Sequence, residues 1–156
     1  MKAILIPTNP NREFSGGQDE GDIRAHEAKI GEAGANYYRL ITPGNWVAAD
    51  FQHREIRRGY FYDVSKKQVT HACEIEWIRP MSDLEYEDSQ RFFLETFRNE
   101  EHFREVSEMF YVLKLTAIFG LRALLRLSDF RKYRDGEPVK LVRNYCIVCD
   151  PGEKRF

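Results

Sequence analysis

Residues 59–78, GYFYDVSKKQVTHACEIEWI, decide the fold class of this chain. Apolar and polar residues alternate on both sides of a short polar turn, and a period of two is typical of antiparallel strands that bury one face. The stretch therefore predicts a β-hairpin, which Pro80 ends because proline cannot donate a ladder hydrogen bond. On its second strand one face is predicted to carry Val69, His71, Cys73, Ile75 and Trp77, and the other Thr70, Glu74 and Glu76.

Further elements follow on both sides of the hairpin. Short strands are predicted over residues 2–6, 36–41, 46–51, 109–127 and 141–149, with a bulge or corner at Gly120. A helix is predicted over 22–33, and residues 82–108 form one helix or two, since Asn99 before two glutamates is good N-cap chemistry. Strands outnumber helices without alternating with them. The chain is therefore predicted to be α+β, a small bent antiparallel or mixed β-barrel with helical insertions.

The two tyrosines of the first hairpin strand carry a further expectation. Tyr60 and Tyr62 share one face of the strand and Phe61 lies on the other, so one of the two faces is predicted to be core. Trp77 shares its face with apolar residues, and a place in the core is therefore expected for it.

Length and charge limit the classes of function. A chain of 156 residues fits one domain, here residues 1–156, and a net charge of −1 argues against binding nucleic acid through bulk positive charge. The charge is uneven, because residues 120–156 hold nine Lys or Arg against five Asp or Glu. These cations either form a solvated surface or contact phosphates.

The cysteines and histidines give no metal or catalytic site. Three cysteines without a signal peptide indicate a reducing compartment, so a cytoplasmic location is expected, and no stretch approaches the ~20 apolar residues of a membrane-spanning helix. Cys146 and Cys149 lie three residues apart, which on a strand directs them to opposite faces, so a zinc site with His71 is disfavoured. No metal, cofactor or catalytic residue is expected.

Two stretches of the chain are similar to a known fold group. Residues 4–11, ILIPTNPN, are similar to the opening strand and Thr-Asn-Pro turn of EVE domains, and the hairpin of residues 59–78 is similar to their central hairpin. The chain thus resembles the PUA-like superfamily, which includes EVE, YTH and ASCH domains, over most of its length. It also resembles the N-terminal specificity domain of archaeal McrB-type modification-dependent restriction systems. It departs from EVE domains at residues 58–60, where Arg-Gly-Tyr replaces a Gly-Asp pair.

The resemblance implies a module that recognises RNA or a modified, flipped DNA base, with nucleic acid as partner and an attached or separate motor or nuclease subunit as a further partner. A flipped base needs an aromatic wall, hydrogen bonds to its edge and cations for its phosphates. The candidates for these roles are Tyr37, Tyr38, Trp46, Tyr60 and Tyr62 for the wall, Asn9, Asn11 and Asp63 for the edge, and Arg122, Arg126 and Arg143 for the phosphates.

Two other functions remain open. An ASCH-like hydrolase of RNA or nucleotides would use Lys66 or Lys67, Tyr62 and acidic residues of 82–108, although the G-x-K-x-x-E-x-R signature of ASCH-type domains is absent. A protein-interaction domain would instead dock a partner on the acidic segment 82–108.

Overall fold

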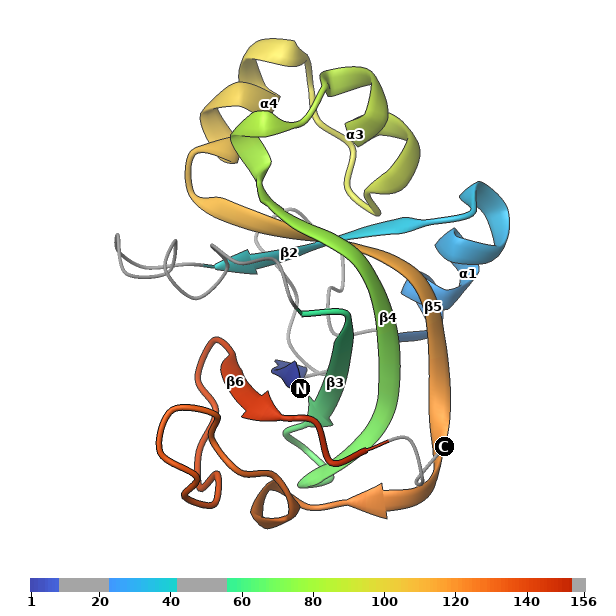
Figure 1. Cartoon of the computed structure of the whole chain (residues 1–156). Coiled ribbons are helices and arrows are strands. Elements are labelled where there is room, and N and C mark those ends of the chain that lie inside the picture. The colour runs from blue at the N-terminus through green and yellow to red at the C-terminus, as the bar shows by residue number, and fades with distance from the viewer. Residues whose placement is uncertain (9–22, 42–55, 153–156) are drawn as a thin grey trace.

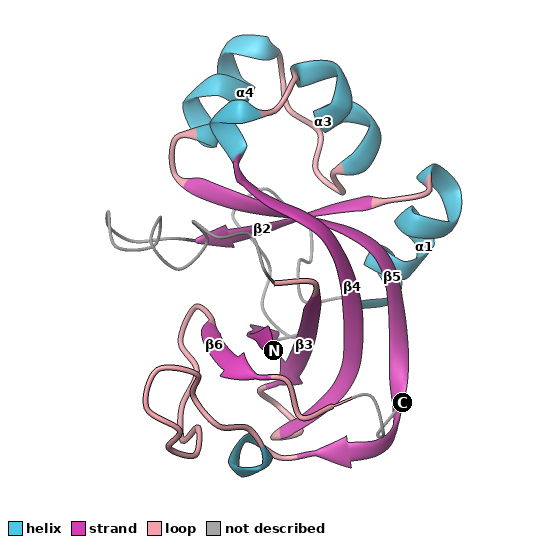
Figure 2. Cartoon of the chain, in the orientation of Figure 1, coloured by secondary structure: helices cyan, strands magenta, loops and turns pink. Residues whose placement is uncertain are grey.

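The structure of the chain is a computed structural model that describes residues 1–8, 23–41 and 56–152. Its strands are β1 (Lys2–Thr8), β2 (Asn36–Ile41), β3 (Arg58–Asp63), β4 (Gln68–Pro80), β5 (Phe110–Leu125) and β6 (Cys146–Cys149). Its helices are α1 (Ile23–Ala33), α3 (Tyr86–Phe92) and α4 (Glu100–Ser107), with short 3-10 turns η1 (Met81–Asp83) and η2 (Leu127–Asp129) (Figure 2). The predicted α+β class is confirmed.

The strands form one mixed sheet in the order β2-β5-β4-β3-β1-β6. β1 pairs in parallel with β3, and the other neighbours are antiparallel. The long strands β4 and β5 curve along their whole length, with α3 and α4 at one end and the β3–β4 turn at the other (Figure 1). After β5 the chain returns to the far edge of the sheet, where the Cys149 amide donates to the Arg131 carbonyl at 2.9 Å. The small bent mixed sheet with helical insertions is thus as predicted.

The core lies on both faces of the sheet. The first core cluster includes Ile6 and Phe61, and the second includes Leu5 and Tyr60, so neighbouring residues of one strand are buried on opposite sides. Tyr60 and Phe61 are both 0% exposed. The prediction that a single face of this strand is core was therefore wrong, because residues of the C-terminal segment, Phe130 among them, cover the second face.

β4 does not keep the single apolar face that the sequence predicted. Its pairing with β5 shifts register between Val69 and His71 and twice more near Ile75. Each shift changes which residues face the same side. Val69 accordingly packs in the second cluster and Cys73 and Ile75 in the first, while Trp77 is half-buried against a third cluster.

The helical insert, residues 82–108, forms two helices, α3 and α4, and Asn99 precedes the second as the sequence indicated. The Asn99 side chain accepts from the His102 amide at 2.8 Å and so caps α4. The third core cluster, which includes Tyr37, Phe93 and Phe103, joins the insert to β2 and β5. Arg39 of β2 reaches the insert through a buried ion pair with Glu95.

The remaining predicted elements differ in extent. The strand predicted over 141–149 is β6, which begins only at Cys146, and Leu141 is 65% exposed. The strand predicted over 46–51 lies outside the described residues. Among the helices of the described part, none is long and apolar enough to cross a membrane.

Candidate nucleic-acid interface

One row of residues crosses three strands near the β3–β4 turn. Tyr62 of β3 pairs with Val69 of β4, and Val69 pairs in turn with Leu125 of β5. This register brings residues 64–67 of the turn to the same end of the sheet as the last residues of β5, as Figure 1 shows. Four exposed cations lie in these two segments, and we name them the basic ridge: Lys66, Lys67, Arg122 and Arg126.

The turn that carries the ridge lysines is built around Asp63. One carboxylate oxygen of Asp63 accepts from the Ser65 amide at 2.9 Å, the Ser65 hydroxyl at 2.6 Å and the Lys66 amide at 3.2 Å. Lys67 completes the turn in the left-handed region, at φ 55°. Asp63 is buried. The sequence predicted that its carboxylate contacts the edge of a base, but one of its oxygens already accepts the hydrogen bonds of this turn.

Apolar side chains interrupt the cations of the ridge. Leu124 is 54% exposed and Val64 is 42% exposed. Tyr62 is half-buried and packs against the second core cluster. The carboxylate of Asp129 is also near, since it accepts from the Arg126 amide at 2.8 Å. The ridge therefore offers several cations around exposed apolar surface, and both kinds of contact suit a nucleic-acid strand.

Three tyrosines of the predicted aromatic wall lie inside the protein. Tyr37 is 4% exposed, Tyr38 is 5% and Tyr60 is 0%. Their rings pack against other rings, as in the 5.4 Å between the centroids of Tyr38 and Phe61. A base cannot stack on an enclosed ring, so this part of the site prediction is corrected. The burial of these tyrosines could not be predicted from alternation, because alternation does not show that both faces of the sheet are covered.

The burial of these phenols opposes their ionisation. Burial raises the pKa of Tyr37 to about 12, and nearby Asp88 adds to the shift. Burial also raises the pKa of Tyr60 above its ordinary value, and its hydroxyl donates to Asp150 at 2.6 Å, which raises it further.

The other predicted residues are not brought to the ridge. Asn9, Asn11 and Trp46 lie outside the described residues. Arg143 is exposed, but it lies in the loop before β6, an edge strand of the sheet on the opposite side from β5. Tyr62, Asp63, Arg122 and Arg126 are therefore the predicted residues that the described structure places at one end of the sheet.

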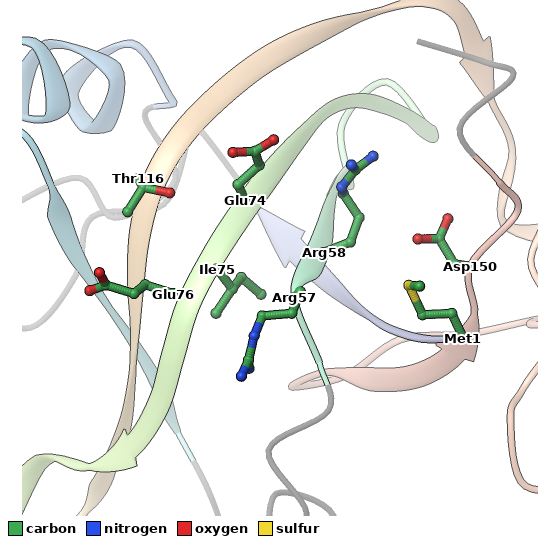
Figure 3. Close-up of a pocket in the computed structure, with 8 residues that line it drawn as sticks. All are labelled: Met1, Arg57, Arg58, Glu74, Ile75, Glu76, Thr116 and Asp150. Atoms are coloured by element: carbon green, nitrogen blue, oxygen red, sulfur yellow. The ribbon is translucent and has the colours of Figure 1, made fainter.

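A hollow of about 440 Å³ opens beside the middle of β4 (Figure 3). Arg57 and Arg58 point in opposite directions within it, and Arg58 lies directly opposite Glu74 in the β3–β4 ladder. Charges of both signs line the hollow, so it does not favour an anion. No local sequence pattern predicts this hollow, because its lining comes from distant segments: Met1, Arg57, Arg58, Glu74, Ile75, Glu76, Thr116 and Asp150.

The residues named for a hydrolase do not converge. Tyr62, Lys66 and Lys67 lie at one end of the 13-residue strand β4, and the acidic helices α3 and α4 lie at its other end. Burial raises the pKa of the Cys73 thiol to about 12, so this thiol is a poor nucleophile. Within the described residues, no group of three or more His, Cys, Asp or Glu is placed to hold a metal ion.

Comparisons with known proteins give one structural similarity. No family model and no curated protein matches the chain. Among solved structures, the chain is similar to the human THYN1 protein, whose crystal structure is a complex with DNA that contains 5-methylcytosine. The two chains are 14% identical, the match covers 81% of this chain and 71% of that one, and the TM-score is 0.43.

Proposed function

We propose that this chain is a PUA-like binding module, without catalytic activity, that contacts RNA or DNA carrying a modified base through the basic ridge. One observation carries the proposal. The register of β3, β4 and β5 gathers Arg122 and Arg126 with Lys66 and Lys67 around exposed apolar side chains. The family resemblance of the sequence supports the same class of ligand.

The physical basis is charge. Lys and Arg side chains that neutralise phosphates release bound counterions, so affinity falls as salt rises. The chain as a whole does not attract nucleic acid, because its net charge is −1. Binding would therefore depend on where its cations lie on the surface. The ridge combines the lysines of the β3–β4 turn with the arginines near the end of β5. A phosphate backbone would run across these side chains.

Fluorescence anisotropy tests the proposal. Labelled single-stranded RNA, plain DNA and DNA with methylated cytosine or adenine are titrated with the protein at low and moderate salt. We expect salt-dependent binding that is strongest for one of these ligands. The double variant Lys66→Glu, Arg122→Glu should lower affinity about tenfold or more. Arg104→Glu reverses one charge, where the ridge variant reverses two, at an exposed residue of α4 at the other end of β4 from the ridge, and should bind as the parent does.

The proposal fails if the parent binds none of these ligands, or if the ridge variant binds as well as the parent. Circular dichroism and the unfolding temperature show whether the variants keep the fold, and the exposure of Lys66 and Arg122 makes a loss of fold unexpected.

A second candidate is supported by the charges of the helical insert. Its Asp and Glu side chains are exposed except for Glu95, which pairs with Arg39. Such a surface suits a basic protein partner. The double variant Glu101→Lys, Glu105→Lys separates the two functions, because it should abolish docking of such a partner and leave binding at the ridge unchanged or stronger.

A further inference from the structure

Trp77 of β4 and Phe92 of α3 form a second surface with cations, away from the ridge. The guanidinium of Arg79 lies 4.7 Å from the Trp77 ring centroid, and that of Arg91 lies 5.0 Å from the Phe92 centroid. The Lys114 ammonium lies 5.8 Å from the same Phe92 centroid. Trp77 and Phe92 are half-buried, while Arg79 and Arg91 are exposed. We name these five side chains the aromatic patch.

The rings of the aromatic patch are held in place from beneath. The Tyr37 ring lies 5.2 Å from Trp77 and 4.9 Å from Phe92, between centroids. Tyr37 is itself fixed by Phe93, whose ring meets it edge-on at 5.3 Å. Because these contacts exist before any ligand arrives, a ligand that binds the patch would not have to order the rings, and less conformational entropy is lost on binding.

The charges around the aromatic patch favour an anion. Arg79, Arg91 and Lys114 are its cations. Glu76 accepts from Lys114 at 2.6 Å, and Asp88 of α3 is close enough to raise the pKa of Tyr37. The three cations outnumber these two carboxylates, so the surface keeps a net positive charge, and the guanidinium groups of Arg79 and Arg91 lie over the rings. A ligand that combines a flat ring with a negative charge matches this surface.

We propose that the aromatic patch binds an unpaired base of a single-stranded nucleic acid, in addition to the phosphate contacts of the ridge. This inference rests on the proposed function. The base stacks on the exposed parts of Trp77 and Phe92 or on the guanidinium planes above them, and the adjoining phosphates meet Arg79 and Arg91. Bases that are paired within a duplex have no open face to offer, so the patch selects single strands.

The fluorescence of Trp77 can report binding at the aromatic patch. In a Trp46→Phe background Trp77 is the remaining tryptophan, since the chain has two. Its fluorescence is followed while the protein is titrated with a single-stranded oligonucleotide, and then with an abasic strand of equal length that keeps the phosphates and lacks the bases. We expect quenching by the first strand only, and affinity about tenfold lower for the abasic strand.

Variants locate the effect. Phe92→Leu and Arg79→Glu should each remove most of the difference between the two strands, while Arg104→Glu, the charge control on α4, should keep it. Arg79 is exposed, so its variant tests the inference even if Phe92→Leu weakens the fold.

The outcomes separate the two proposals. If both strands bind equally, with salt dependence and without quenching, the aromatic patch does not bind bases and the ridge proposal stands. If neither strand nor any ligand of the anisotropy series binds, both proposals are overturned.

Discussion

Val69 of β4 lies directly opposite Leu125 of β5, and the preceding pair along the ladder is His71 with Gly120. Two steps along β4 thus correspond to five along β5, so β5 carries extra residues between Gly120 and Leu125. These residues include Arg122 and Leu124, which are both exposed. The bulge that Gly120 signalled in the sequence is therefore the feature that presents part of the ridge to solvent.

The first prediction concerns the number of phosphates that the ridge contacts. Replacing Arg126 by Ala should reduce the slope of log affinity against log salt by about 1, because one cation fewer releases counterions. Anisotropy titrations at a series of salt concentrations measure this slope. Arg104→Ala serves as the control, and a slope that is the same in Arg126→Ala and the parent would place Arg126 outside the interface.

The second prediction concerns the close approach of β3 to β4. A Cβ added at Gly59 would lie 2.7 Å from the Cys73 sulfur and 3.3 Å from Ile75 Cδ1, in a fully packed part of the core. Gly59→Ala should therefore destabilise the protein by about 1 to 3 kcal/mol. Urea unfolding measures the change. Combining it with Cys73→Ala should recover part of the loss, and strictly additive effects would show that the two positions do not clash.

The third prediction concerns the buried pair of Arg39 and Glu95. Burial raises the pKa of Glu95, although the Arg39 guanidinium acts in the opposite direction. Glu95→Ala should cost about 3 to 5 kcal/mol, because the buried cation then lacks this carboxylate. The double variant Arg39→Met, Glu95→Leu should be far closer to the parent in urea unfolding. Equal losses in both variants would assign the cost to packing and not to charge.

The fourth prediction concerns alkaline pH. The folded chain keeps the Cys73 thiol protonated up to a pKa of about 12, whereas an exposed thiol ionises near pH 8.5. The unfolded state then binds fewer protons, so the free energy of unfolding falls as pH rises above about 9. By pH 10 the loss from Cys73 is about 1 to 2 kcal/mol.

Cys73→Ala should flatten this fall in stability, measured by urea unfolding between pH 8 and pH 10.5. The raised pKa of Tyr37 acts in the same direction, so some slope should remain. Identical slopes in Cys73→Ala and the parent would contradict the burial of the thiol.

The fifth prediction concerns the contact that ties residue 150 to the sheet. Tyr60→Phe removes the hydroxyl that donates to Asp150 and should destabilise the protein by about 1 to 2 kcal/mol. Hydrogen exchange of the β6 amides should quicken in the same variant, whereas exchange in the helical insert should not change. An unaltered β6 would show that the strand is held by its ladder alone.

The sequence predicted the elements with a strong local signal. Alternation identified the hairpin, Asn99 marked the break between the helices, and Gly120 marked the irregular part of β5. The order of the strands, with β1 parallel to β3, depends on contacts between distant segments that no local pattern encodes.

The site was harder to predict than the fold. An aromatic residue on an alternating strand is exposed only if nothing covers that face, and here Phe130 covers Tyr60 while Phe92 and Phe93 cover Tyr37. The exposure of Arg122 in β5 and of Arg126 just after it could be predicted, because charged side chains are rarely buried. The packing of Phe92 and Trp77 on the same tyrosine, Tyr37, could not be predicted, because it depends on how the insert packs against the sheet.

The pairing of β1 with β6 has a mechanical consequence. Lys2 lies opposite Cys149, and the Asp150 amide donates to the Met1 carbonyl at 2.8 Å. The start of β1 and the end of β6 therefore lie side by side at one end of their antiparallel ladder. A pulling force applied at residues 1 and 152 would load the hydrogen bonds between β1 and β6 in unzipping geometry, one pair after another. In shear geometry the same bonds would be loaded all together. A tether at these points would detach β6 first and leave the row of Tyr62, Val69 and Leu125 under little load.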